Sequence, residues 1–231
     1  MRANNDVYRH RRKAYGELEF TDDFMFRKVL RNNSKLCADL IELLLGVRVK
    51  DIRYKDDDHS IAPSPEAKGV RLDVYLDDAD GTVFDLEMQN LEGECLPRRV
   101  RYYQSMIDIE HIEAGDPYSA LPDSYIVFIC MFDPYKKGLH KYEFRELCIQ
   151  NPEIELGDGT SKVFINARSR EEDMSDDMRA FLDYLCGQDA RSDLTRVIAG
   201  DVAREMAKAI SRLMSMTGMP SICVNSNLYR H

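Results

Sequence analysis

Apolar and polar residues alternate along residues 71–89, and this alternation predicts two β-strands joined by a tight turn. The apolar residues occupy the even positions, namely Leu72, Val74, Leu76, Phe84, Leu86 and Met88. The polar residues occupy odd positions, namely Arg71, Asp73, Asp77, Asp85, Glu87 and Gln89. Because successive side chains of a strand point to opposite faces, we expect one face to enter a core and the other to collect carboxylates. The turn, residues 77–81, is rich in Asp and Gly, which tolerate turn conformations.

Apolar residues at helical spacing predict helices before and after this hairpin. We expect Thr21 to be the N-cap of the first helix, with Asp22 and Asp23 in its first turn, where the helix dipole favours carboxylates. Ser34 is expected to cap a second helix, which Gly46 ends. Further helices are predicted over residues 97–114, 178–185 and 194–214.

Strands are predicted between these helices, at residues 47–55, 124–132, 141–148 and 162–166. Residues 124–132 are almost uninterruptedly apolar, as expected of a strand that is buried on both faces. The order of the elements is helices, strand, hairpin, helix, buried strand and a mixed end. This order predicts an α/β fold, in which a central mixed β-sheet is flanked by helices on both faces and followed by C-terminal helices.

Length and composition suggest one domain. A chain of 231 residues suits a core of ordinary size with a helical appendage. No apolar run is long enough to span a bilayer, and the first residues lack the apolar segment of a signal peptide, so we expect a cytoplasmic protein without membrane contact. The six cysteines are scattered without zinc or CxxC spacing, so we expect reduced thiols, with Cys37 and Cys130 buried.

Charge leaves two interpretations open. The net charge of −9 argues against indiscriminate binding of nucleic acid, which needs local positive charge. Basic residues nevertheless cluster at the start of the chain and at Arg98, Arg99 and Arg101, immediately after the hairpin. From charge alone, both clusters are explained as solvated surface. An acidic hairpin between basic clusters also suits an enzyme that holds a polyanion against metal ions.

The hairpin brings two carboxylates together. If the strands pair symmetrically about Asp80, Asp73 lies opposite Glu87, and their Cβ atoms are ~5 Å apart. Like charges at this spacing destabilise a sheet, and a divalent cation would neutralise them, because hard cations bind carboxylate oxygens. Gln89 lies on the same face as Glu87, so both can address one ion. A hairpin with one solvated acidic face is the competing interpretation.

Two segments around the hairpin carry a likeness to a known family, Lys68-Gly-Val-Arg-Leu-Asp-Val-Tyr-Leu and Gly81-Thr-Val-Phe-Asp-Leu-Glu-Met-Gln89. They resemble the PD-(D/E)XK nuclease family transposases, which are related to recombination-promoting nucleases. Residues 21–26, 99–105, 142–145 and 156–160 resemble further family segments in the same order. The likeness runs from about residue 19 to about residue 187 and implies a restriction-endonuclease-like core.

The chain is accordingly predicted to have four parts. These are a basic flexible arm over residues 1–19, a nuclease-like domain over 20–168, a C-terminal helical region over 169–215 and an irregular tail over 216–231. The tail departs from the family, whose members usually continue with a charged helix. This departure suggests a truncated or frame-shifted product of a mobile element.

The resemblance implies roles for individual residues. Asp73 matches the metal-binding aspartate, Glu87 matches the acidic residue of the (D/E)XK element, and Gln89 replaces the usual lysine. The implied cofactor is Mg²⁺, with Mn²⁺ as a substitute, held by the two carboxylates and the backbone carbonyl of Met88. Accessory candidates are Asp22 and Gln104, and candidate DNA contacts are Arg98, Arg99, Arg101 and Tyr102.

The implied function is that of a metal-dependent DNA endonuclease that hydrolyses phosphodiester bonds in recombination or transposition. A homodimer is considered, because double-strand cleavage by such a core commonly uses two copies of the site. Two alternatives remain. One is a catalytically weak or inactive nucleic-acid-binding relative, since Gln89 has neither the charge nor the titratable proton of lysine. The other is an interaction module whose hairpin is merely solvated.

Overall fold

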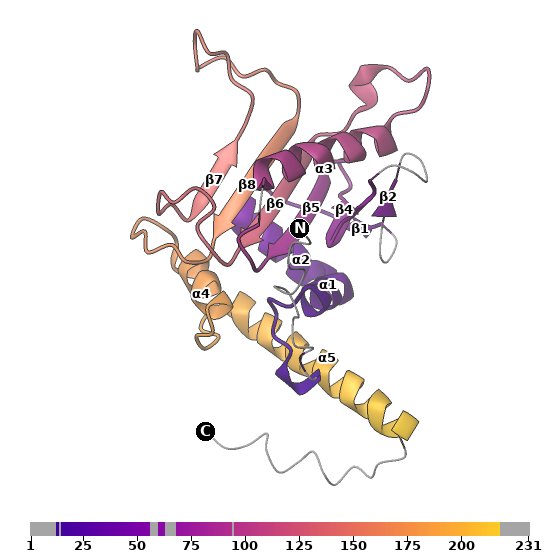
Figure 1. Cartoon of the computed structure of the whole chain (residues 1–231), viewed down its shortest axis with the longest axis vertical. Helices are drawn as coiled ribbons and strands as arrows, with labels where there is room; N and C mark the ends of the chain where they lie inside the picture. Colours follow the sequence, from indigo (N-terminus) through magenta and orange to yellow (C-terminus); the bar gives the residue numbers. More distant parts are fainter. Residues whose placement is uncertain (1–12, 14, 56–59, 63–67, 94, 218–231) are drawn as a thin grey trace, which may run out of the picture.

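A mixed β-sheet forms the centre of the structure, a computed structural model that describes residues 13, 15–55, 60–62, 68–93 and 95–217 (Figure 1). The strand order along the sheet is β1 (Arg53–Tyr54), β4 (Val74–Asp77), β5 (Val83–Gln89), β6 (Ser124–Cys130), β8 (Thr160–Asn166) and β7 (Lys141–Phe144). Strands β5, β6 and β8 are parallel, whereas β1–β4, β4–β5 and β7–β8 pair antiparallel. A separate two-stranded ribbon joins β2 (Ser60–Ile61) to β3 (Val70–Arg71).

Helices cover both faces of this sheet. They are α1 (Asp23–Asn32), α2 (Ser34–Leu45), α3 (Leu96–His111), α4 (Asp176–Leu185) and α5 (Asp193–Thr217), with short 3-10 turns at η1 (Tyr15–Glu17) and η2 (Tyr118–Ala120). Helix α3 lies on one side of the sheet, and α1, α2, α4 and α5 lie on the other (Figure 1). The predicted α/β architecture is therefore confirmed, including the C-terminal helices.

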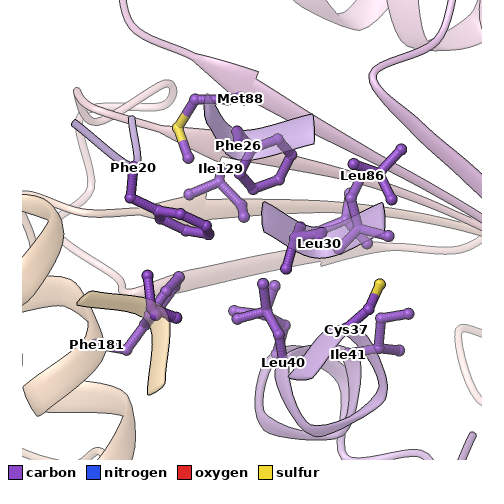
Figure 2. Close-up of a cluster of buried hydrophobic side chains, with 14 of the residues drawn as sticks. Phe20, Phe26, Leu30, Cys37, Leu40, Ile41, Leu86, Met88, Ile129 and Phe181 are labelled. Carbon is purple, nitrogen blue, oxygen red and sulfur yellow. The ribbon is translucent and has the colours of Figure 1, made fainter. Parts of the chain in front are cut away.

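The larger core lies between the sheet and the first, second, fourth and fifth helices. The even-numbered hairpin residues Val74, Leu76, Phe84, Leu86 and Met88 all belong to it. Figure 2 shows Leu86, Met88 and Ile129 of the sheet gathered with Phe26 and Leu30 of α1, Leu40 of α2 and Phe181 of α4. Five of the six predicted apolar positions are thus buried together as predicted, and they anchor the hairpin. The exception is Leu72, which precedes the bend at Asp73 and is buried instead in a second core with α3.

The middle of the odd-numbered face of the hairpin is also buried, because α3 packs on it. Tyr75 and Val83 of the hairpin join Val100, Tyr103 and Ile107 of α3 in a second core. The hypothesis that the acidic residues of this face are merely solvated is therefore wrong for Asp85 and Glu87, which are buried. Asp73 stays partly exposed, and this difference in burial determines the chemistry of the carboxylates.

The register of the hairpin is the predicted one. Val74 pairs with Leu86 and Tyr75 pairs with Asp85. Asp73 lies in a bend just before β4, and its backbone N–H donates to Glu87 Oε1 at 3.0 Å. Strand β6 pairs on the other side of β5, with Glu87 level with Phe128. The predicted buried strand at residues 124–132 is confirmed as β6, whose first and last residues are Ser124 and Cys130.

Both predicted helix caps are displaced by one residue. Asp22, rather than Thr21, is the N-cap of α1, and Asn33, rather than Ser34, is the N-cap of α2. Asn33 takes the position because its side-chain oxygen accepts a hydrogen bond from the backbone N–H of Leu36 at 3.1 Å. The predicted end of α2 at Gly46 is confirmed, with a left-handed backbone (φ 74°) that suits glycine.

Several elements are shorter in the structure than the sequence predicted. The strand expected over residues 47–55 contains only Arg53–Tyr54, since only these pair with β4. The third helix ends at His111 rather than at residue 114, and β7 ends at Phe144 rather than at residue 148. Most of the predicted arm (residues 1–12 and 14) and nearly all of the predicted tail (residues 218–231) lie outside the described residues.

Asn33 ties the first two helices to the last. Besides capping α2, its amide nitrogen donates to Asp201 Oδ2 of α5 at 2.8 Å, and that aspartate is buried. We expect Asn33→Ala to lower the free energy of unfolding by about 2 kcal/mol, because it removes a helix cap and leaves a buried carboxylate without this partner. Urea denaturation measures the change. Ser34→Ala, at the exposed neighbouring position, is the control and is expected to cost far less.

The described cysteines are free, as predicted. Burial raises the pKa of both Cys37 and Cys130 to about 12, so these thiols stay protonated at neutral pH. In the described part of the chain, no helix has both the length and the apolar character that crossing a membrane requires.

Candidate active site

A cavity of about 630 Å³ opens where the hairpin, α1 and the start of α3 meet. The predicted site residues that line it are Asp22, Asp73, Glu87, Met88, Gln89 and Arg99. They come from four places in the chain: the N-cap of α1, the bend between β3 and β4, the end of β5, and the first turn of α3. The fold therefore brings together residues that are up to about 80 positions apart in sequence.

Asp73 and Glu87 hold each other in place through the backbone. The N–H of Asp73 donates to Glu87 Oε1 at 3.0 Å, and the N–H of Met88 donates to Asp73 Oδ2 at 3.3 Å. Burial raises the pKa of both carboxyls, and the charges of Asp85 and Asp73 raise that of Glu87 further. The hydrogen bond from Met88 works against the shift at Asp73. Two crowded, partly desolvated carboxylates favour a cation beside them.

Arg99 lies beside this pair and bonds Glu87 directly, and the charges of Arg27 and Arg99 both work against the raised pKa of Asp73. The guanidinium of Arg99 donates from Nη2 to Glu87 Oε2 at 2.7 Å and from Nη1 to Gln89 Oε1 at 2.8 Å. A third bond runs from Nε to the hydroxyl of Tyr103 at 3.0 Å. The guanidinium carbon also lies 5.0 Å from the ring centroids of Tyr103 and Phe128, within cation–π range. Arg99 is therefore held in place by contacts with four residues.

The other predicted DNA contacts lie outside the cavity. Arg98 and Arg101 are exposed on α3. The hydroxyl of Tyr102 donates to the backbone carbonyl of Lys68, which ties α3 to the segment before β3. Of the three arginines singled out from the sequence, only Arg99 lines the cavity.

The two accessory candidates are separated by the fold. Asp22 lines the cavity, and its Oδ2 accepts from the backbone N–H of Glu19 at 2.7 Å and from Lys13 Nζ at 3.0 Å. Gln104 is not among the cavity-lining residues. Its amide nitrogen donates to Asp108 Oδ1 and Ser124 Oγ, both at 2.9 Å, and so it stabilises the packing of α3 on the start of β6.

Sequence reasoning missed Asp85 as a member of the carboxylate group. Its side chain is fully buried, and neither carboxylate oxygen has a hydrogen-bond partner within the described structure. Burial raises the pKa of Asp85 well above its usual value, and the charge of Asp73 raises it further, whereas Arg99 lowers it. The alternating pattern placed Asp85 on the polar face, but the burial of that face by α3 is not visible in a local pattern.

Replacing Asp85 by asparagine is expected to change how stability depends on pH. Because the folded-state pKa is raised, the carboxyl contributes no penalty below its unfolded value of about 4 and destabilises the fold as pH rises through the folded value. Asp85→Asn removes this penalty, so the variant should gain stability relative to wild type from pH 4 upward. Urea denaturation in EDTA at pH 4.5, 6 and 8 measures the difference.

Asp80→Asn is the matched control for this experiment, since Asp80 is an exposed aspartate at the tip of the same hairpin. A stability difference between Asp85→Asn and wild type that stays constant, or that falls with rising pH, would contradict the burial argument. The asparagine amide adds an offset of its own, which does not depend on pH.

Three further basic residues line the cavity: Lys13, Arg27 and Arg71. Lys13 belongs to the basic cluster at the start of the chain, and it pairs with Glu19 at 2.9 Å and Asp22 at 3.0 Å. Arg27 comes from α1 and Arg71 from β3. The cavity therefore combines the carboxylates of Asp73 and Glu87 with basic residues from separate elements. This arrangement suits a phosphate group and a metal ion bound together.

The donor set fits a divalent cation bound by oxygen. Asp73 and Glu87 supply two carboxylates at a solvent-open cavity, and Mg²⁺ is typically held by one or two carboxylates together with water and substrate phosphates. Within the described residues, no group of three or more His, Cys, Asp and Glu could hold a metal by itself. The arrangement therefore suits Mg²⁺ with substrate rather than a closed zinc site. The carbonyl of Met88 as a further ligand stays a prediction.

The family model that describes PD-(D/E)XK nuclease family transposases matches residues 20–216. That span includes the whole sheet, the hairpin carboxylates, Arg99 and nearly all of α5. No curated protein and no solved structure matches the chain.

Proposed function

Since the chain belongs to the PD-(D/E)XK nuclease family transposases, with a restriction-endonuclease-like α/β fold, we propose that it is a metal-dependent DNA endonuclease. The reaction proposed is hydrolysis of phosphodiester bonds in DNA recombination or transposition. The observation that carries the proposal is the pairing of Asp73 with Glu87 at a cavity lined by basic residues. Carboxylates and cations in one cavity suit a substrate whose reacting group is an anion.

The two carboxylates are the proposed ligands of Mg²⁺ or Mn²⁺. Glu87 is fixed in orientation because the N–H of Asp73 and the guanidinium of Arg99 each bond one of its oxygens. Asp73 is fixed by the N–H of Met88. A divalent ion bound there would lower the pKa of a coordinated water molecule and would stabilise the negative charge that develops on the phosphate. The protein supplies the fixed positions that make this stabilisation effective.

The basic residues of the cavity are proposed to hold the DNA backbone. Arg27 of α1 and Arg71 of β3 line the cavity, and Arg98 and Arg101 are exposed on α3, which also contributes Arg99 to the lining. Contacts of this kind position a duplex without reading its sequence. Binding is therefore expected to weaken steeply as salt concentration rises.

One observation favours a second candidate, a binding protein without catalysis. Gln89 carries no charge, and its amide is engaged at both ends, with Oε1 accepting from Arg99 at 2.8 Å and Nε2 donating to the carbonyl of Leu91 at 2.6 Å. It therefore has little freedom to orient a water molecule. A relative that binds DNA and does not cleave it would keep the salt-sensitive binding but show no cleavage.

Incubation of supercoiled plasmid with the purified protein in Mg²⁺ or Mn²⁺ distinguishes the two candidates. Nicked or linear product that disappears in EDTA supports the endonuclease. Salt-sensitive retention of the plasmid in a gel without any cleavage, by a protein that shows a cooperative unfolding transition, supports the binding protein. Absence of both binding and cleavage would contradict both candidates.

A further inference from the structure

Arg99 differs from an ordinary DNA-contacting arginine in how firmly it is placed. Its guanidinium bonds Glu87, Gln89 and Tyr103 and lies against two aromatic rings, although 38% of its side chain stays exposed to solvent. Arg98 and Arg101, on the same helix, are exposed. A side chain that is ordered before substrate arrives loses little conformational entropy on binding, so its charge is preorganised at the site.

The guanidinium retains donors for a ligand. Arginine carries five N–H groups, and the contacts to Glu87, Gln89 and Tyr103 use three of them. One N–H on each terminal nitrogen is not used in these bonds. Because Arg99 lines the cavity together with Asp73 and Glu87, these two donors suit the oxygens of a phosphate that lies against the carboxylates.

Gln89 has a defined task in this arrangement. Its oxygen accepts from Arg99, and its amide nitrogen is anchored to the carbonyl of Leu91. It therefore presents an acceptor that orients the guanidinium, a task that a lysine at this position could not perform because its ammonium group only donates. The side chain at position 89 and the cation at position 99 form one unit.

We propose that Arg99 is the phosphate-binding cation of this site and that Gln89 acts on the reaction as a positioning residue, through Arg99. This inference rests on the proposed endonuclease function for its rate effects, but it also makes a statement about DNA binding that does not depend on cleavage. In this proposal the positive charge of the site comes from Arg99 of helix α3, because Gln89 at the end of β5 is neutral.

A double-mutant cycle tests the proposal. The proteins are wild type, Gln89→Ala, Arg99→Gln and the double variant, measured for cleavage in Mg²⁺ and for binding of a short DNA duplex in Ca²⁺. We expect Arg99→Gln to lower kcat about 10²-fold. In the binding assay, the slope of log K against log salt concentration should become shallower by about one, which corresponds to the loss of one phosphate contact. Gln89→Ala should lower kcat about tenfold with Arg99 present and less than about twofold in the Arg99→Gln background.

Two further variants keep the test decisive. Arg99→Lys retains a cation beside the buried Glu87, so it serves as a second variant in case Arg99→Gln does not fold. It should still lower kcat, because lysine lacks the planar, forked donors of the guanidinium group. Gln89→Lys should not raise the rate, since a second cation would repel Arg99. Arg196→Gln, at an exposed arginine on α5, is the control for loss of one positive charge.

The outcomes separate this inference from the proposed function. Additive effects of Gln89→Ala and Arg99→Gln, or a faster Gln89→Lys variant, would overturn the action of Gln89 through Arg99. A kcat and a salt dependence of binding that Arg99→Gln leaves unchanged would overturn the role of Arg99 in binding phosphate. Either result leaves the endonuclease intact. A wild-type protein that binds duplex but never cleaves would overturn the endonuclease alone, and the binding cycle then decides on Arg99. A wild type that fails to bind duplex would overturn both.

Discussion

Asp73→Asn and Glu87→Gln are each expected to lower metal-dependent plasmid cleavage by at least about 10³-fold, equivalent to about 4 kcal/mol of transition-state stabilisation. Each substitution keeps the shape of the side chain and removes the negative charge that would hold a divalent cation. The two carboxylates are held side by side, because the backbone N–H of Asp73 donates to Glu87 Oε1. Removing either charge therefore disables the pair.

Cleavage rates from a supercoiled plasmid in Mg²⁺ and in Mn²⁺ measure this loss. Asp80→Asn, which removes an exposed carboxylate from the turn of the same hairpin, is the matched control and should cleave as wild type does. Binding of a DNA duplex by the two site variants should persist, because the basic residues are unchanged. Cleavage by Asp73→Asn or Glu87→Gln at the rate of the control would rule out this pair as the catalytic site.

Phe26→Ala is expected to have the largest effect on stability, a loss of about 3–5 kcal/mol in the free energy of unfolding. The ring of Phe26 is fully buried in the larger core, where it lies near Ile129 and Met88 (Figure 2) and packs edge-to-face on Phe20, with ring centroids 5.3 Å apart. Truncation removes apolar area from the core and leaves a cavity at the junction of α1 with the sheet.

The same helix offers the control. Phe24, two residues earlier, is 48% exposed, so Phe24→Ala should cost less than about 1 kcal/mol. Urea denaturation of wild type and both variants measures the difference, provided that the slope of the transition is unchanged. Equal losses for Phe24→Ala and Phe26→Ala would show that α1 does not pack on the sheet as described.

The hairpin is where prediction from sequence succeeded best. Its alternation is a local property: the two-residue period of a strand assigns each side chain to a face, and the Asp- and Gly-rich turn sets the register. Asp73 opposite Glu87 follows from these facts alone, and the observed pairing of Val74 with Leu86 agrees with it. Helix ends marked by glycine, such as Gly46, were predictable for the same local reason.

Caps and short strands were harder to predict because neighbouring candidates compete. Thr21 and Asp22 both suit an N-cap, as do Asn33 and Ser34, and the choice depends on which backbone turn the rest of the chain allows. The strand at residues 47–55 is paired only at Arg53 and Tyr54, because a strand exists only where a partner strand lies beside it. Such errors leave the fold class unaffected.

The sequence by itself therefore determined the α/β architecture, the hairpin register and the pairing of Asp73 with Glu87, because these depend on periodicity and on residues close together in the chain. Only the tertiary structure decided that α3 covers the second face of the hairpin. That packing buries Asp85, engages Gln104 away from the cavity and sets Arg99 against Glu87 and Gln89. The physical reason is that burial and ion pairing across elements depend on how a helix docks on a sheet, and no local pattern encodes this.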